Sequence, residues 1–320
     1  MPNTIEKLLL AAPRGYCAGV DRAVQTVERA LEIHGAPVYV RKQIVHNKHV
    51  VEVLSERGAI FVEHEDEVPV GALTVFSAHG VSPKVRDGAK ARELRTIDAT
   101  CPLVTKVHVE ARKFAQDGYT IVLVGHEGHE EVEGTMGEAP ERIVLVQDEA
   151  DVEKLEIEDP ERVAYITQTT LSVDETSSIV ERLKERFPAI TGPRTDDICY
   201  ATTNRQTAVK QMAGQCDLML VIGSRNSSNS VRLVEVARDC GTEAYLIDNV
   251  GEVQELWLEG KRVVGVSSGA SAPDDLVQDL LEFFRVRGVT EISEHHAVRE
   301  DVRFMLPKQI REGLAEKAGS

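Results

Sequence analysis

The chain has 320 residues, of which 42% are hydrophobic and 28% are charged, and its formal net charge at pH 7 is −16. This length exceeds the roughly 250–300 residues that a single hydrophobic core usually serves, so we expect two or three domains. Nucleic acids and anionic membranes are bound through basic surfaces, and a membrane helix needs about 20 apolar residues, so the sequence disfavours both partners. The apolar run at residues 8–12 is too short for a signal peptide, and we expect a cytoplasmic location.

One pattern of alternating strands and helices begins three times along the chain, each time at a cysteine. In each copy a strand-like run leads into the cysteine and a helix pattern follows it. The runs cover residues 8–12, 95–99 and 196–198, the cysteines are Cys17, Cys101 and Cys199, and the helices cover residues 20–31, 104–115 and 203–213. Each cysteine therefore lies where a strand passes into a helix.

Each copy continues with three further strands and two polar loops. The second strands cover residues 38–40, 121–124 and 218–222, and the loop residues 28 or 29 positions after the cysteines are His46, His129 and Ser227. The third strands cover residues 60–62, 143–146 and 244–247. The fourth strands cover residues 73–76, 163–166 and 263–266, and the loops after them carry His79, Thr169 and Ser271. These matching spacings indicate an internal threefold repeat.

Strands that alternate with helices predict parallel sheets, and such sheets bind ligands beyond the carboxyl ends of their strands. We therefore expect an α/β fold of three similar units with mainly parallel sheets, at residues 1–98, 99–196 and 197–285. A pseudo-threefold arrangement of the units would turn the cysteines and polar loops toward one central cavity. Residues 286–320 break the pattern and are expected to pack back on the body as a tail.

Three cysteines without a fourth partner fit two kinds of metal centre. Catalytic zinc takes three protein ligands and keeps one open position. A four-iron cluster normally takes four cysteines, so three would leave one iron open to substrate. The alternative is that all three are small buried hydrophobic residues. Cys216 and Cys240 do not lie at a strand's carboxyl end, and we interpret them as core or surface residues.

The polar loops predict an anion site. Residues 227–229 and Ser271 precede predicted helices, whose N–H groups favour phosphate. A nearby dianion raises the pKa of histidines, so His46, His79 and His129 can add positive charge. Spare histidines would compete as ligands at a zinc site, so the set fits an anion better. For each residue alone, a role as an ordinary loop residue or helix cap is the alternative.

Eight segments of the chain carry longer motifs. They are residues 13–20 (PRGYCAGV), 77–82 (SAHGVS), 98–104 (DATCPLV), 132–137 (VEGTMG), 168–172 (QTTLS), 197–206 (DICYATTNRQ), 226–230 (NSSNS) and 269–273 (GASAP). Taken together, these segments resemble the 4-hydroxy-3-methylbut-2-enyl diphosphate reductase family. The resemblance covers nearly the whole chain and is weakest in the last thirty residues.

The resemblance implies an iron–sulfur enzyme that removes the allylic hydroxyl of its diphosphate substrate reductively, giving isopentenyl and dimethylallyl diphosphate and water. Electrons would come from reduced ferredoxin or flavodoxin. Cys17, Cys101 and Cys199 would hold a 4Fe-4S cluster with an open apical iron. Glu131 would deliver the proton, and Thr169 would lie near the substrate hydroxyl. The residues implied to bind the diphosphate are His46, His79, His129, Ser227, Ser228, Asn229 and Ser271.

Breaking a C–O bond requires a positioned acid, and Glu131 shares a loop with His129. The residues alone do not rank it above Glu133; the resemblance does. The chain departs from the family pattern at Glu130, where proline is common, and at Glu127, where a small residue is common. Both changes add negative charge beside a diphosphate site, and we expect both side chains to point outward.

Two other functions fit the same residues. One is a three-cysteine zinc hydrolase for a phosphorylated substrate, which needs neither iron nor electrons. The other is a cluster protein that senses iron or oxygen, which would not need histidines and a serine–asparagine loop around an anion. Iron content distinguishes the zinc hydrolase from the reductase, and turnover of the diphosphate distinguishes the reductase from the sensor.

Overall fold

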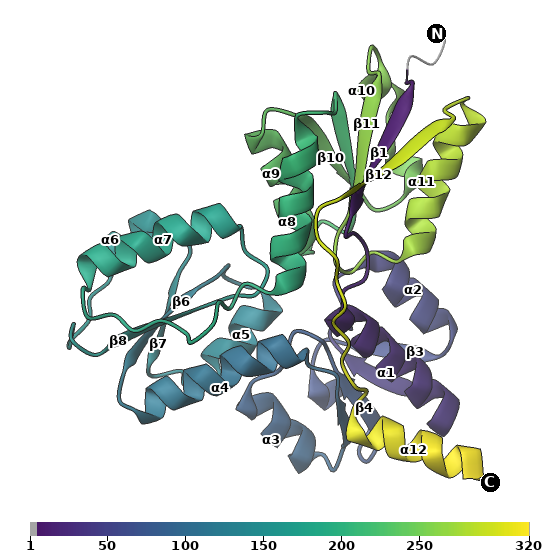
Figure 1. The fold of residues 1–320 in the computed structure, drawn as a ribbon. Helices are drawn as coiled ribbons and strands as arrows, with labels where there is room; N and C mark the ends of the chain where they lie inside the picture. Colours follow the sequence, from purple (N-terminus) through teal and green to yellow (C-terminus); the bar gives the residue numbers. More distant parts are fainter. Residues whose placement is uncertain (1–4, 320) are drawn as a thin grey trace. The chain divides into compact units, whose positions relative to one another are not determined.

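The computed structural model describes residues 5–319 (Figure 1). The chain forms two compact units. Unit 1 comprises the chain up to Ala18, His46–Val50 and Tyr200–Arg303, and unit 2 comprises Gly19–Val45, Val51–Cys199 and the chain from Phe304 onward. Within the described range, no helix is long and apolar enough to cross a membrane.

Unit 1 is built on a single parallel sheet. Its elements are β1 (Lys7–Ala12), α8 (Tyr200–Ala213), β9 (Leu218–Ile222), α9 (Ser228–Asp239), β10 (Glu243–Ile247), η2 (Val250–Glu252), α10 (Glu255–Leu258), β11 (Val263–Ser268), α11 (Asp274–Val286) and β12 (Glu291–His296). The strand order is β10-β9-β11-β1-β12. Successive strand residues point to opposite faces, so Leu8 and Leu10 pack with α11, whereas Leu9 and Ala11 pack with α8 and α9 (Figure 1).

Unit 2 contains two parallel sheets, with strand orders β3-β2-β4-β5 and β7-β6-β8. The elements of the first are α1 (Ala18–His34), β2 (Val38–Arg41), α2 (Lys48–Glu56), β3 (Ala59–Val62), η1 (Glu65–Glu67), β4 (Leu73–Phe76), α3 (Pro83–Ala91) and β5 (Arg95–Asp98). Those of the second are α4 (Pro102–Gln116), β6 (Thr120–Val124), α5 (Glu130–Met136), β7 (Ile143–Val146), α6 (Glu149–Lys154), β8 (Val163–Thr167) and α7 (Val173–Arg186), and α12 (Lys308–Gly319) closes the chain.

The second sheet of unit 2 places α4 and α5 on one face and α6 and α7 on the other. Ile121 and Leu123 of β6 pack with the α4–α5 side, and Val122 and Val124 pack with the α6–α7 side. Burying a side chain of this size contributes about 1.5–3 kcal/mol. The alternation along β6 therefore fixes both helix layers, and with them the loop after β6 that carries His129.

The strand predicted just before Cys199 is absent. Residues 196–198 form no strand, and only an isolated bridge joins Ala164 to Thr191. Pro193 lacks the N–H that a ladder needs. The backbone oxygens of Thr195 and Asp196 are bound instead by a side chain, the Lys106 ammonium. This segment is therefore held by a cation where the other two copies use a strand.

The prediction of an α/β fold with parallel sheets is confirmed, because every pair of neighbouring strands in the described residues is parallel. The boundaries at residues 98, 196 and 285, the central cavity and the tail at residues 286–320 stay predictions. The run at residues 8–12 pairs with β11 and β12, far along the chain, and not with the strands that follow it.

Candidate active site

The three cysteines of the repeat occupy equivalent positions. Cys17 directly precedes α1, Cys101 is the N-cap of α4, and Cys199 directly precedes α8. None forms a disulfide. Each cysteine N–H donates to a carbonyl in a loop that follows a strand. The acceptors are Ala270 at 3.2 Å from Cys17, Ala78 at 2.9 Å from Cys101 and Thr169 at 3.0 Å from Cys199.

These carbonyls connect each cysteine to a predicted polar residue. His79 and Ser271 directly follow Ala78 and Ala270, and Thr169 is itself the acceptor. The start of a long helix favours a thiolate, because its free N–H groups and dipole stabilise negative charge.

The other two cysteines have different surroundings. Burial raises the pKa of the Cys216 thiol to about 12, so it stays protonated at neutral pH and is a poor metal ligand. Cys240 is exposed at the carboxyl end of α9. Neither shares the environment of the three cysteines at the helix starts.

A buried carboxyl group lies at the centre of the candidate site in unit 2. Glu131 is only 2% exposed, and both its oxygens are bound by Thr169. The Thr169 N–H donates to Oε1 at 2.6 Å, and the Thr169 hydroxyl donates to Oε2 at 3.0 Å. Burial raises the pKa of Glu131, although the bonds from Thr169 oppose this shift. A carboxyl group with a raised pKa is suited to donating a proton.

His129 begins the helix that carries Glu131. It caps α5, and its Nδ1 accepts a hydrogen bond from the Glu131 N–H at 3.1 Å. Burial, reinforced by His79 and His126, lowers the pKa of His129 to about 3. In this structure His129 is therefore neutral, with Nδ1 as acceptor and the proton on Nε2. That state donates a hydrogen bond without adding charge, and the positive charge expected beside a bound dianion stays a prediction.

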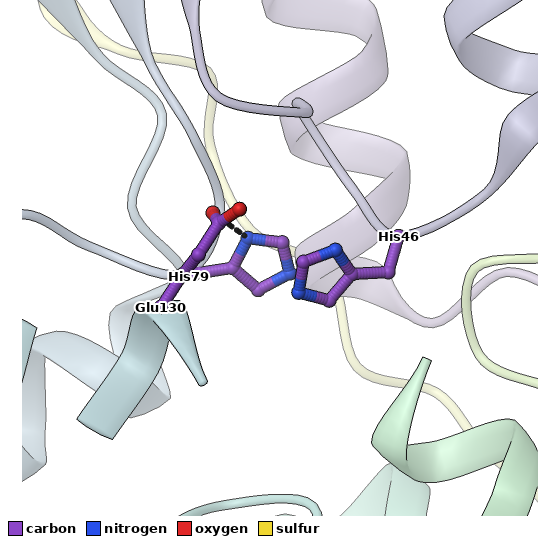
Figure 2. Close-up of side chains that lie close together, drawn as sticks. All are labelled: His46, His79 and Glu130. Carbon is purple, nitrogen blue, oxygen red and sulfur yellow. Dashed lines mark hydrogen bonds and ion pairs between the residues drawn. The ribbon is translucent and has the colours of Figure 1, made fainter. Parts of the chain in front are cut away.

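His79 is paired with the carboxylate of Glu130, a side chain that we expected to point outward. Its Nδ1 lies 3.1 Å from Oε2 of Glu130, and the two side chains are 14% and 18% exposed (Figure 2). The outward orientation predicted for Glu130 is therefore wrong, whereas Glu127 is exposed as predicted. Glu130 begins α5, and a helix start favours the acid while His79 provides its partner.

Unit 1 brings together the serines and His46. The Ser271 hydroxyl donates to the backbone oxygen of His46 at 2.9 Å and lies 3.4 Å from the hydroxyl of Ser227. Asn226 Nδ2 lies 3.4 Å from Nδ1 of His46. Ser227 also caps α9, and Ser228 is the first residue of that helix. These contacts place both serine loops and the His46 loop at one location in this unit.

Asn229 links the same loops to the start of α8. Its Oδ1 accepts the Ala270 N–H at 2.8 Å, and its Nδ2 lies 3.3 Å from the hydroxyl of Thr202. Its side chain therefore holds the backbone that receives the Cys17 N–H.

The structure adds residues that the sequence did not single out. Ser230 donates from its hydroxyl to that of Ser227 at 3.0 Å. A Cβ at Gly223 or Gly269 would lie 2.2 or 1.9 Å from Ser230 Oγ, so both positions exclude any side chain. The glycines just after β9 and β11 were the available signal, because close backbone approach is a common reason for glycine at a strand end.

The predicted residues thus fall into two groups. Unit 1 holds Cys17, His46, Ser227, Ser228, Asn229 and Ser271, and unit 2 holds Cys101, Cys199, His79, His129, Glu131 and Thr169. The first group is a cysteine, a histidine and the polar residues of the two serine loops. The second group is a buried acid, its threonine partner, two histidines and two cysteines.

The model of the family described as LytB protein matches residues 8–285 of the chain. The match spans more than half of the chain and includes all residues of both groups. The chain belongs to the LytB family.

Relatives of this LytB protein match it along nearly its whole length. A protein from Nocardia farcinica named 4-hydroxy-3-methylbut-2-enyl diphosphate reductase is 59% identical over 310 residues, covering 97% of this chain and 92% of the relative. One of the same name from Cutibacterium acnes is 60% identical over 309 residues, covering 96% of each.

A solved LytB-type structure, E-1-hydroxy-2-methyl-but-2-enyl-4-diphosphate reductase from Plasmodium falciparum, matches with a TM-score of 0.93 and 39% identity. It covers 99% of this chain and 100% of the solved one. A second, described as (E)-4-hydroxy-3-methyl-but-2-enyl diphosphate reductase and the terminal enzyme of the non-mevalonate pathway, matches with a TM-score of 0.63 and 30% identity, covering 88% of this chain and 100% of the solved one.

Proposed function

We propose that this LytB protein is an iron–sulfur oxidoreductase that reduces (E)-4-hydroxy-3-methylbut-2-enyl diphosphate. Two electrons and two protons convert the substrate to isopentenyl or dimethylallyl diphosphate and one water. The observation that carries the proposal is the buried Glu131 held by Thr169, whose carbonyl in turn binds the Cys199 N–H. Thr169 thus contacts both a buried carboxyl group and the backbone of a cysteine at a helix start, which supports an acid and a metal ligand at neighbouring positions in a chain whose relatives carry the reductase name.

The donor set fits an iron–sulfur cluster. Cys17, Cys101 and Cys199 form no disulfide, and each lies at the start of a helix. Thiolates are the protein ligands of iron–sulfur clusters, and a 4Fe-4S cluster held by three would keep one iron open to substrate. When bound, such a cluster supplies electrons and a Lewis-acidic iron.

The diphosphate would be held without a lysine. Ser227, Ser228 and Ser271 offer hydroxyl groups, and the start of α9 offers backbone N–H groups and a favourable dipole. His129 can add a neutral Nε2–H donor in unit 2. We propose that His46, His79 and Asn229 act on the same anion.

Glu131 would supply the proton for the departing hydroxide. Because burial raises its pKa, it retains a proton at a pH at which an exposed glutamic acid has lost it. After transfer, the Thr169 N–H and hydroxyl stabilise the carboxylate that remains. Thr169 therefore serves the acid in both of its states and can reach the substrate hydroxyl beside it.

The electron donor belongs to the same proposal. A reduced ferredoxin or flavodoxin would deliver electrons singly, and the cytoplasm would provide both the donor and the reducing conditions that keep the thiols free. An acidic chain of net charge −16 supports a small anionic substrate in a local site more than it supports nucleic acid or membrane.

Anaerobically purified protein tests the proposal. We expect a brown protein with about four irons and four sulfides per chain. It should turn over the hydroxylated diphosphate with dithionite and a viologen mediator. A colourless protein with zinc would support the hydrolase instead, and a brown protein without turnover would support a sensor.

A further inference from the structure

A cationic side chain follows each of the three cysteines at nearly the same spacing. Arg22 and Lys106 lie five residues after Cys17 and Cys101, and Arg205 lies six residues after Cys199. Each lies on the helix that starts at its cysteine. None of the three belongs to the acid or anion groups described above, so their role requires a separate explanation.

Arg22 binds the segment that precedes Cys101. Its Nη1 donates to the backbone oxygens of Ala99 at 2.9 Å and Thr100 at 3.0 Å. Its Nε donates to the backbone oxygen of Met305 at 2.8 Å. Burial lowers the pKa of the guanidinium, and the charges of Asp98 and Cys101 oppose this shift. Arg22 therefore holds the two carbonyl groups that directly precede Cys101.

Lys106 binds the segment that precedes Cys199. Its ammonium donates to the backbone oxygens of Thr195 at 2.5 Å and Asp196 at 3.1 Å, and to Oδ1 of Asp197 at 2.9 Å. Oδ2 of Asp197 accepts the Thr167 N–H at 2.9 Å. Burial raises the pKa of Asp197, and the Thr167 and Lys106 contacts oppose this shift. Lys106 thereby ties the irregular Cys199 segment to the end of β8.

Arg205 binds the segment that precedes Cys17. Its Nε and Nη2 both donate to the backbone oxygen of Gly15, at 3.2 and 2.7 Å. The side chain is fully buried, and Nη1 also pairs with Glu300 at 3.0 Å. Gly15 has a φ of +68°, a backbone conformation that side-chain-bearing residues rarely adopt. Its carbonyl is thus presented to Arg205 by a conformation that glycine allows.

The three contacts follow one rule. The helix after Cys17 holds the segment before Cys101, the helix after Cys101 holds the segment before Cys199, and the helix after Cys199 holds the segment before Cys17. We propose that Arg22, Lys106 and Arg205 are positioning residues for the three cysteines, each fixing the backbone that leads into the next one in cyclic order. The part of this inference that concerns a cluster rests on the proposed function.

The chemistry of the segments explains why cations are needed. Arg22 and Lys106 each donate to the carbonyl oxygens of consecutive residues outside regular structure. The carbonyls that Arg22 binds belong to buried residues, and buried carbonyls without donors are costly. The buried group that Lys106 binds is the carboxylate of Asp197, which would be costly without a cation. A guanidinium or ammonium satisfies several oxygens from one point.

Hydrogen–deuterium exchange of the full-length, anaerobically purified protein tests the positioning role. We expect Arg22→Gln to speed amide exchange about five- to tenfold at residues 98–101 and to leave residues 195–199 and 13–17 unchanged, because only local bonds are lost. Lys106→Gln should act only at residues 195–199, and Arg205→Gln only at residues 13–17. Uniform acceleration at all three segments, or none, would overturn the inference.

Matched variants on the same helices serve as controls. Arg29 of α1 pairs only with exposed Glu32 among the contacts described, and Lys113 of α4 is exposed. Arg29→Gln and Lys113→Gln should leave all three segments unchanged. If a glutamine variant does not fold, Arg22→Lys, Lys106→Arg and Arg205→Lys keep the charge. These variants should show the same local pattern with smaller acceleration, and a global change would contradict the inference.

Iron retention provides the second measurement. In air, each glutamine variant should lose iron about threefold faster than wild type or more, because its cysteine is less well positioned. The electron paramagnetic resonance signal of a three-iron form should appear correspondingly earlier. Wild-type protein without iron would refute the proposed function but leave the exchange pattern to decide the positioning role. If wild type holds iron and every variant loses it at the wild-type rate, the role of Arg22, Lys106 and Arg205 at the cluster would be refuted.

Discussion

At the scale of single residues, the chemistry depends on how Glu131 keeps its proton. The carboxyl group is buried, and its two oxygens are bound by one residue, Thr169. Burial acts against the charged form and raises the pKa, and the hydrogen bonds limit the shift. Glu131 therefore keeps its proton to a higher pH than an exposed glutamic acid does, and Thr169 stabilises the carboxylate that remains after transfer.

Glu131→Gln tests the proton donor. The amide keeps the size and one acceptor for Thr169 but cannot donate a carboxylic proton, so turnover should fall about 10²–10⁴-fold. Iron content and colour should remain those of wild type. Steady-state turnover with a viologen mediator measures the loss, and an active variant of normal iron content would contradict the assignment.

The same variant should change the dependence of stability on pH. Because the folded pKa of Glu131 is raised, its protonated form stabilises the fold below the unfolded pKa, and this contribution is lost as pH rises through the folded pKa. Glutamine does not titrate. Thermal unfolding between about pH 5 and about pH 9 should therefore show wild type losing stability relative to Glu131→Gln as pH rises. A constant difference would show that the folded pKa is not raised.

Glu130 is the residue whose position the sequence did not predict. Its carboxylate pairs with His79, a proposed diphosphate ligand (Figure 2). In Glu130→Gln the Nδ1–H of His79 keeps an acceptor, but the negative charge of the carboxylate is removed. We expect KM for the diphosphate to fall about two- to fivefold at low salt, since repulsion of the substrate is removed. Steady-state kinetics measure KM, and Glu127→Gln, at an exposed position, serves as the control. An unchanged KM would show that the charge of Glu130 does not act on the substrate.

At the scale of elements, the anion loops of unit 1 depend on close packing around one serine. Ser230 of α9 fits between Gly223 and Gly269, which directly follow β9 and β11. Its hydroxyl reaches Ser227, which in turn lies beside Ser271. The ends of two neighbouring strands and the start of one helix are therefore fixed against each other by the absence of two side chains.

Gly269→Ala tests this packing. The new Cβ would lie 1.9 Å from Ser230 Oγ, and overpacking of this kind costs about 1–3 kcal/mol. A Ser230→Ala background lacks the Oγ, and the nearest side-chain atom is then the Cβ at position 230, at 3.0 Å. The overpacking cost of Gly269→Ala should therefore be smaller in that background. Urea unfolding of the two single variants and the double variant gives the coupling energy. Equal costs in both backgrounds would show that the loop moves freely.

At the scale of the whole molecule, the proposed cluster ligands come from residues far apart in the chain. Cys17 belongs to unit 1, whereas Cys101 and Cys199 belong to unit 2. A metal centre that binds the folded chain stabilises it by mass action. The function and the stability of the molecule should therefore depend on the same three thiols.

Removal of iron by a chelator under anaerobic conditions should lower Tm by several degrees. In a chain of this size or somewhat smaller, each kcal/mol lost from the free energy of unfolding lowers Tm by roughly 2–4 °C. Cys17→Ser should reproduce the effect and reduce iron content. Cys240→Ser, at an exposed position, should do neither. Calorimetry with iron analysis compares them, and an unchanged Tm after iron loss would show that the cluster does not stabilise the fold.

The sequence by itself determined most strands, the helices that follow the three cysteines, the positions of these cysteines and the polar loops after the strands. These features follow from local periodicity and spacing, which act over a few residues. Residues 8–12, 121–124 and 218–222 were predicted as strands and lie in β1, β6 and β9. Cys101 and Thr169 were placed in loops at strand ends, where the structure has them.

Only the tertiary structure decided which distant segments form hydrogen bonds and ion pairs with one another. It pairs β1 with β11, replaces the strand expected at residues 196–198 by contacts with Lys106, and turns Glu130 toward His79. The partners in these contacts are separated by tens to hundreds of residues, so no local pattern encodes them. Their physical cause is the requirement that buried carbonyls and charges find partners, and this requirement is met only after the chain has folded.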